Sequence, residues 1–198
     1  LTQKARSVYD ATVTESDAAV GAIIDHIAQL GLSDRTLFVL TSDHGEEFLD
    51  HGMLYHGNQL HRELMAVPLI MAGPGVPKGK VITERAENRH LFDTLLTRWI
   101  DPASPIEGTD LLDPIALKAA ASRPLFSTTS LGIVRDPGGG FSPNRDMHAV
   151  RTHKDLLIWA PPAVAPRTGR DPLPEVRWYF DLEKDPQAQH SIPLAPNS

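Results

Sequence analysis

An apolar run that ends directly at an acidic, histidine-rich segment constrains this chain most. Residues 36–40 are β-branched and aliphatic without interruption, which is typical of a buried strand. Thr41-Ser42-Asp43-His44-Gly45-Glu46-Glu47 follows at once, and four of the nine histidines lie between His44 and His61. Open α/β sheets place their chemistry at the carboxyl ends of strands. Carboxylates and imidazoles bind divalent cations, so the segment indicates a metal-dependent hydrolytic site, or part of one.

The elements around this segment predict an α/β fold. Apolar residues recur at helical spacing over residues 4–30, and Gly31 supplies a stop signal. A second apolar run, residues 67–72, carries Pro68 near its start or at a sheet edge, where strands tolerate proline. A helix is expected from Asn88, as its cap, to Ile100. The order helix, strand, loop, strand, helix predicts part of a largely parallel sheet flanked by helices over roughly the first 100 residues.

The rest of the chain predicts a small antiparallel β subdomain. A short helix is expected at residues 115–121, and strand candidates follow at 125–129, 147–152, 156–159 and 176–182. The runs 147–152 and 156–159 lie at hairpin distance from each other. Alternation places five apolar residues on one face of this sheet: Val150, Leu156, Ile158, Trp178 and Phe180. Residues 138–140 and 161–174 are expected as loops. We therefore expect an α/β part over 1–122 and a subdomain over 123–198.

Composition excludes several classes of protein. The net charge is −6 over 198 residues, so the chain has no basic footprint for nucleic acid. No apolar run approaches the ~18 residues that a membrane-spanning helix needs. The absence of cysteine excludes disulfides and thiolate metal sites. The chain opens at Leu1 without a methionine or a signal-peptide pattern, so we expect a fragment or a processed product.

The same residues resemble the sulfatase family of the alkaline-phosphatase-like superfamily, in its C-terminal portion. The opening helix, the strand and residues 41–46 are similar to the family's second metal-binding strand end. His51-Gly52, His56, Glu63 and residues 67–70 resemble the segment that follows it. Residues 108–112 are similar to the family's G-R-S-L-L run, and residues 149–154 and 179–186 resemble its closing antiparallel strands. The resemblance covers roughly residues 5–192, and the order and spacing of these motifs make it specific.

The resemblance implies an enzyme that hydrolyses a sulfate ester with a divalent metal ion, and a phosphate or phosphonate ester is the second choice of substrate. Ca²⁺ is the first choice, with Mn²⁺, Mg²⁺ and Zn²⁺ as alternatives. Asp43 and His44 would be metal ligands. His56 would stabilise charge on the ester oxygens or protonate the leaving group. His51, His56 and His61 are five residues apart and so do not share one helical face, which argues against a helical zinc stripe.

The chain also departs from the family pattern. The family's nucleophile and two further metal-binding carboxylates belong to an N-terminal half, and this chain has no C-x-P-x-R or S-x-P-x-R segment. We therefore expect a C-terminal fragment that is inactive alone, with the nucleophile in the missing half. His90 and Asp93 stand where the family usually has Asp and Pro. These two changes are expected to affect packing rather than chemistry.

Other functions stay open on the sequence alone. A phosphoryl or phosphoethanolamine transferase, or a phosphonate or phosphate ester hydrolase of the same superfamily, would share these motifs. A non-catalytic metal- or carbohydrate-binding module is the alternative from another class. Asp43 could cap the following turn instead of binding a metal, since Asp at a strand end often accepts backbone N–H bonds. His56 could be a surface histidine. Substrate, localisation and oligomeric state are not specified.

Overall fold

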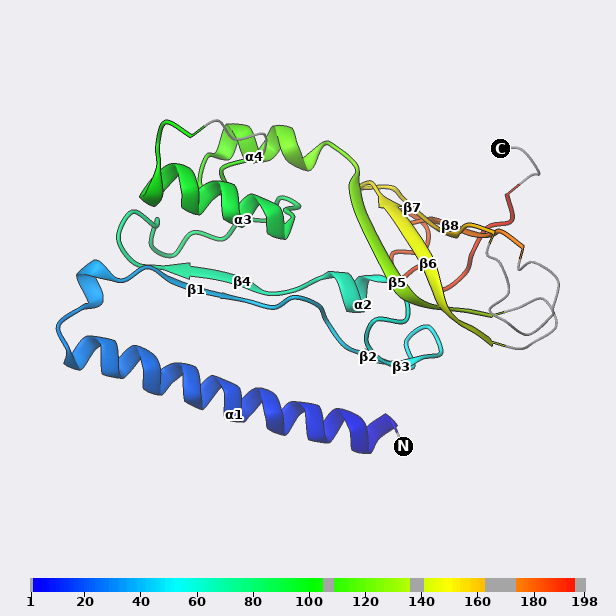
Figure 1. The fold of residues 1–198 in the computed structure, drawn as a ribbon, viewed down its shortest axis with the longest axis horizontal. Helices are drawn as coiled ribbons and strands as arrows, with labels where there is room; N and C mark the ends of the chain where they lie inside the picture. The colour runs from blue at the N-terminus through cyan, green and yellow to red at the C-terminus, as the bar shows by residue number, and fades with distance from the viewer. Residues whose placement is uncertain (1, 105–108, 136–140, 163–173, 195–198) are drawn as a thin grey trace. The chain divides into compact units, whose positions relative to one another are not determined.

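The structure, a computed structural model, describes residues 2–104, 109–135, 141–162 and 174–194 (Figure 1). The chain forms two compact units, one from residues 1–56 and 61–80 and the other from 57–60 and 81–198. The expected boundary between an α/β part and a C-terminal subdomain at residue 122 stays a prediction. None of the described helices combines the length and the apolar character that crossing a membrane requires.

The first unit contains the predicted opening helix and the two predicted strands. Helix α1 spans Thr2–Gln29, and Gly31 follows with a φ of 67°, the left-handed conformation expected of a glycine stop. A 3₁₀ turn, η1 (Ser33–Arg35), leads to β1 (Phe38–Thr41), and the second strand is β4 (Leu69–Ala72). Pro68 directly precedes β4, so it removes no hydrogen bond from the strand interior.

The pairing of these strands differs from the expected parallel arrangement. β1 and β4 run antiparallel, with Phe38 opposite Ala72 and Thr41 opposite Leu69. No parallel pair occurs among the described strands. The chain leaves β1, passes through residues 42–68 and returns beside β1 in the opposite direction, as strands do in mixed sheets. The side chains of β1 are mostly half-buried and those of β4 mostly exposed, so neither is the fully buried strand that its apolar sequence predicted.

The polar segment between β1 and β4 is a loop with three short elements. β2 (Glu47–Phe48) and β3 (Leu54–Tyr55) pair antiparallel, and α2 spans Arg62–Met65. Helix α1 anchors this loop through two contacts. The Tyr9 ring meets the Phe48 ring edge-on at 5.2 Å, and Arg6 forms an ion pair of 3.2 Å with Asp50. The loop expected between the two strands is therefore present, and it contains two short strands and one short helix.

The second unit begins with helices. α3 spans Asn88–Leu95 and continues as the π-helical turn η2 (Leu96–Ile100), and α4 spans Pro114–Ala121. The N-cap of α3 is Glu87, one residue before the expected Asn88. His90 is buried, and its Nδ1 accepts a hydrogen bond from the Glu87 N–H, which closes a capping box. This contact agrees with the packing role expected of His90.

A four-stranded antiparallel sheet completes the second unit, as predicted. Its strands occur in the order β5 (Leu125–Arg135), β6 (Phe141–Arg151), β7 (Asp155–Ala160) and β8 (Val176–Asp181). The β6–β7 hairpin pairs Arg151 with Leu156. The loop expected at residues 138–140 and most of the one at 161–174 lie outside the described residues.

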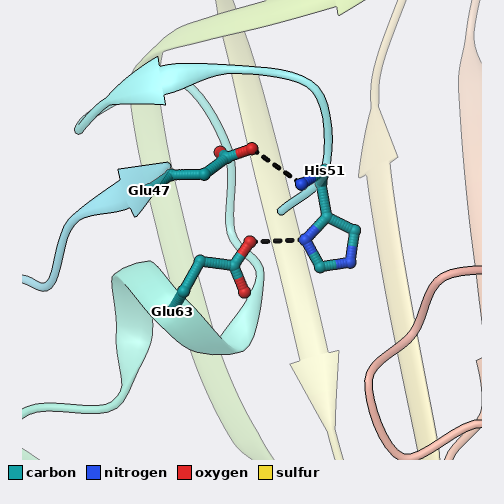
Figure 2. Close-up of side chains that lie close together, drawn as sticks. All are labelled: Glu47, His51 and Glu63. Carbon is teal, nitrogen blue, oxygen red and sulfur yellow. Dashed lines mark hydrogen bonds and ion pairs between the residues drawn. The ribbon is translucent and has the colours of Figure 1, made fainter. Parts of the chain in front are cut away.

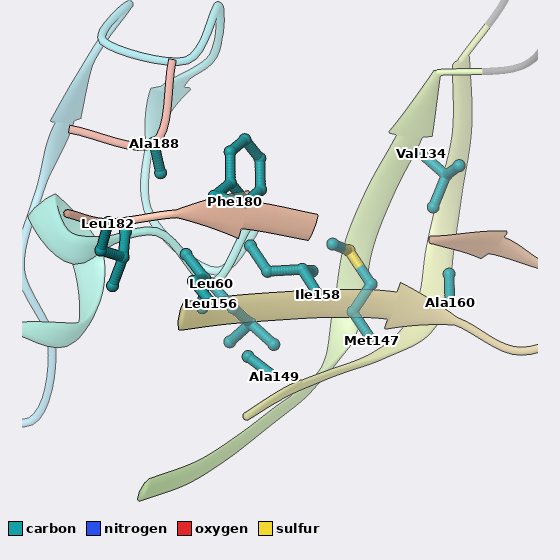
Figure 3. Close-up of a cluster of buried hydrophobic side chains, with 10 residues drawn as sticks. All are labelled: Leu60, Val134, Met147, Ala149, Leu156, Ile158, Ala160, Phe180, Leu182 and Ala188. Atoms are coloured by element: carbon teal, nitrogen blue, oxygen red, sulfur yellow. The ribbon is translucent and has the colours of Figure 1, made fainter. Parts of the chain in front are cut away.

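One face of this sheet forms the core of the second unit (Figure 3). Leu156, Ile158 and Phe180 lie in it, as predicted. Val150 does not, because the hairpin register places Ala149 opposite Ile158 and turns Val150 to the other face. A shift of one residue along a strand changes its face, so the sequence alternation alone misassigned Val150. Ten buried residues make up the core: Leu60, Val134, Met147, Ala149, Leu156, Ile158, Ala160, Phe180, Leu182 and Ala188.

Candidate functional site

The predicted metal ligands lie in the tight turn that follows β1. The Ser42 hydroxyl donates to the His44 carbonyl at 2.7 Å, and the His44 N–H donates to Asp43 Oδ1 at 3.0 Å. The Asp43 side chain is 86% exposed. Backbone hydrogen bonds and the neighbouring His44 hold the pKa of Asp43 below its ordinary value. Asp43 is therefore an accessible anion at neutral pH.

The hydrogen bond of the His44 ring determines which of its nitrogens can bind a metal. His44 Nδ1 lies 2.9 Å from the Gly45 carbonyl, which only accepts, so Nδ1 carries the hydrogen. In the neutral ring, Nε2 then keeps its lone pair. His44 Nε2 is 3.7 Å from Asp43 Oδ1. Two ligand atoms at ~2.1 Å from one ion lie at most about 4 Å apart, so this pair fits one divalent cation.

His56 lies against His44. The two rings stack with their centroids 4.1 Å apart and their planes 24° apart. Glu46 Oε2 lies 3.2 Å from His56 Nδ1, and since a carboxylate accepts, Nδ1 is the donor. Tyr55, the residue before His56, has a φ of 71°, which is rare for a bulky residue and is often found at functional sites. The structure thus brings Asp43, His44 and His56 together.

Gly45 allows this turn to approach α2 closely. Its N–H donates to the Leu64 carbonyl at 2.8 Å. A Cβ atom at position 45 would lie 2.0 Å from the Glu63 carbonyl oxygen, well inside contact distance. Only glycine fits here without a backbone shift, so packing against α2 explains why a glycine follows Asp43 and His44.

A second group of ionisable side chains lies in the same loop (Figure 2). Glu47, His51 and Glu63 come from β2, from the β2–β3 connection and from α2. Each offers one possible ligand atom, and these atoms lie within 4.8 Å of one another. His51 Nδ1 forms a very short hydrogen bond with Glu63 Oε1. Sequence reasoning singled out His51 and Glu63 as motif positions but did not group them with Glu47.

Burial affects the two carboxylates of this group differently. Burial raises the pKa of Glu47, and the backbone N–H bonds from Met53 and His51 only partly oppose it. Burial also acts to raise the pKa of Glu63, but the hydrogen bond and charge of His51 outweigh it and hold that pKa below its ordinary value. The His61 ring stacks on His51 at 3.6 Å with the two planes 4° apart, so His61 has a packing role.

Comparison with known proteins identifies the family. The family model described as Sulfatase matches residues 2–99, which include the Asp43-His44 turn, His56 and Glu63. Residues 2–99 of the chain are therefore similar to the sulfatase family. Arylsulfatase K of Bos taurus is 28% identical over 94% of this chain and 33% of its own length. An arylsulfatase of Clostridium perfringens is 28% identical over 93% of this chain and 35% of its own length.

A solved sulfatase-like structure supports the fold. It was determined in complex with its substrate D-glucosamine-2-N,6-O-disulfate and superimposes with a TM-score of 0.66 at 19% identity. The superposition covers 91% of this chain and 34% of that protein. The α/β class with small antiparallel sheets therefore matches the fold of that protein. The chain spans about a third of the length of these relatives.

Proposed function

We propose that this chain supplies metal ligands and a substrate-facing histidine to a sulfatase that hydrolyses a sulfate ester. The geometry of Asp43 and His44 is the observation that supports this most. The exposed Asp43 Oδ1 lies 3.7 Å from His44 Nε2, and the other ring nitrogen of His44, Nδ1, donates to the Gly45 carbonyl. A hydrogen bond from the nitrogen that does not bind the metal is the usual way in which proteins orient a histidine ligand. The match of residues 2–99 to the sulfatase family supports the proposed reaction class.

Two protein ligands are fewer than a catalytic metal site normally has. We therefore propose that other parts of the protein provide the remaining ligands and the nucleophile, and that this chain is the C-terminal part of the enzyme. A bound divalent cation polarises the ester oxygens and lowers the pKa of the attacking group. Ca²⁺ is the proposed ion by family resemblance, while the imidazole of His44 also suits Mn²⁺ and Zn²⁺.

His56 is proposed to act on the ester directly. Its Nδ1–H is bound to Glu46, so Nε2 is the atom that remains to meet a substrate. When the His56 ring carries a proton on both nitrogens, its Nε2–H can pass to the leaving oxygen as the S–O bond breaks, or can stabilise negative charge on the sulfuryl oxygens. The His56 ring stacks on the ring of His44, and this contact supports a position for His56 next to the proposed metal.

The test is an arylsulfatase assay on the complete gene product that contains this chain. Metal content and the hydrolysis of 4-nitrophenyl sulfate should both fall in Asp43→Ala and in His44→Ala. His153→Ala is the matched control, because His153 is exposed in the β6–β7 turn. Chelation should abolish activity, and added metal should restore it. Full metal content and unchanged turnover in both ligand variants would refute the assignment. Preference for 4-nitrophenyl phosphate would instead favour the phosphoryl-transfer relatives.

A further inference from the structure

Glu47 has an unusual environment for a carboxylate. Its side chain is completely buried, with 0% exposure. Oε1 accepts the N–H groups of His51 and Met53, each at 2.9 Å. Oε2 is also buried and accepts no hydrogen bond from any described residue. A buried carboxylate oxygen without a partner is costly unless something neutralises it.

Two further ligand groups face the Glu47 side chain. Figure 2 shows Glu47, His51 and Glu63 converging from three separate segments. The side chains of His51 and Glu63 are only 10% and 19% exposed. Their possible ligand atoms and that of Glu47 lie within 4.8 Å of one another, compared with the roughly 3.4 Å that separates ligand atoms around one zinc ion. The three side chains would therefore have to move closer together to share one ion.

The chemistry of this set points to a particular kind of ion. One imidazole and two carboxylates form a mixed nitrogen and oxygen set, which suits Zn²⁺ better than Ca²⁺ or Mg²⁺. The carboxylates of Glu47 and Glu63 can carry two negative charges, whereas His51 can carry only one positive charge, so the cluster is short of positive charge. A divalent cation would supply that charge and would take the place of the proton between His51 Nδ1 and Glu63.

We propose that Glu47, His51 and Glu63 form a second divalent-metal site, separate from Asp43 and His44, that binds Zn²⁺ with a structural role. The ion would join β2, the β2–β3 connection and α2. These segments flank His56 in the sequence, so the site would hold in place the loop that carries it. His61, stacked on His51, would close one side of the site.

The experiment counts metal ions rather than activity, so that it stands apart from the proposed sulfatase function. The complete gene product with Asp43→Ala and His44→Ala serves as the host, because its first site is removed. The host is stripped with a chelator, incubated with Zn²⁺, dialysed and analysed for zinc. Two further variants are built on this host. Glu47→Gln keeps the side-chain shape and removes the charge, and Glu15→Gln alters an exposed carboxylate on α1 as a matched control.

We expect one Zn²⁺ per chain in the host and in Glu15→Gln, and at least a tenfold weaker affinity in Glu47→Gln. Circular dichroism checks that each variant is folded. If Glu47→Gln does not fold, Co²⁺ added to the host gives an independent answer, because a site of low coordination number produces intense visible absorption. No retained zinc and no such absorption in the host would overturn the proposal. Equal zinc affinity in folded Glu47→Gln would also overturn it.

Discussion

Replacing Gly45 with alanine tests whether the Asp43-His44 turn is held by its close approach to α2. The new Cβ would lie 2.0 Å from the Glu63 carbonyl oxygen and 3.0 Å from the Glu63 carbonyl carbon. Real Cβ atoms essentially never come within 3.0 Å of such an atom, so the two segments must separate by about 1 Å. The obstructing atoms belong to the backbone of α2, and no side-chain rotation can relieve the clash.

The expected loss of stability has two contributions. Overpacking of a close contact costs about 1–3 kcal/mol. Separation of the segments also breaks the 2.8 Å hydrogen bond from the Gly45 N–H to the Leu64 carbonyl, at about 0.5–1.5 kcal/mol. The free energy of unfolding should therefore fall by roughly 2–4 kcal/mol. With an m value on the order of 2 kcal/mol/M, the urea midpoint should fall by about 1–2 M.

Urea denaturation followed by circular dichroism measures this loss, and Gly21→Ala is the control. Gly21 lies inside α1, and a Cβ atom added there would have nothing within 4 Å of it. Alanine at this position should therefore raise stability by about 0.5–1 kcal/mol through helix propensity. The two glycine variants should thus move in opposite directions. A Gly45→Ala protein as stable as wild type would show that the approach of the turn to α2 is not tight, and the packing argument for this glycine would fail.

Four other substitutions test the remaining parts of the structure. Leu156→Ala, at a core position that is 1% exposed, should lower the free energy of unfolding by about 2–5 kcal/mol in the same urea assay. Burial holds the pKa of His90 below its ordinary value, so its contribution to stability is present above pH ~6.5 and is lost as the pH falls further. Thermal melts between pH 5 and 8 should show this loss in wild type and less of it in His90→Gln. In the complete enzyme, His56→Ala should lower kcat by on the order of 10²-fold with a smaller change in KM. Glu46→Gln should lower kcat less than His56→Ala does, because the glutamine amide oxygen still accepts from His56 Nδ1. If kcat is unchanged in His56→Ala, His56 is a surface histidine without a role in the reaction.

Local patterns in the sequence predicted most of the elements and the antiparallel pairing of β6, β7 and β8, but not the pairing of β1 with β4. Helical spacing and Gly31 predicted α1, and alternation with hairpin spacing predicted β6, β7 and β8. The antiparallel pairing of β1 with β4 could not be read from two apolar runs, because an apolar run does not show the direction of its partner. Val150 was misassigned for a related reason. Hairpin register depends on turn geometry, and a shift of one residue exchanges the two faces.

The candidate site was predictable only where the chemistry is local. Asp43 and His44 are adjacent and follow a strand, so their juxtaposition is present in the sequence itself. The grouping of Glu47, His51 and Glu63 depends on how a 17-residue loop folds back, because the three residues do not lie in one helix or strand. The buried state of Glu47 was also unpredictable, since glutamate is almost never fully buried unless it is paired.

The roles proposed for the histidines of the loop follow from their hydrogen-bond partners rather than from residue type. His44 Nδ1 meets a backbone carbonyl, which fixes that nitrogen as a donor and leaves Nε2 for the proposed metal. His56 Nδ1 meets the carboxylate of Glu46, which orients the ring and leaves Nε2 for the proposed substrate. His51 Nδ1 meets Glu63 in a buried setting, where a proton or a metal ion must balance the carboxylates. The proposed role of each histidine thus depends on its hydrogen-bond partner, so Glu46 and Glu63 belong to the candidate site together with His56 and His51.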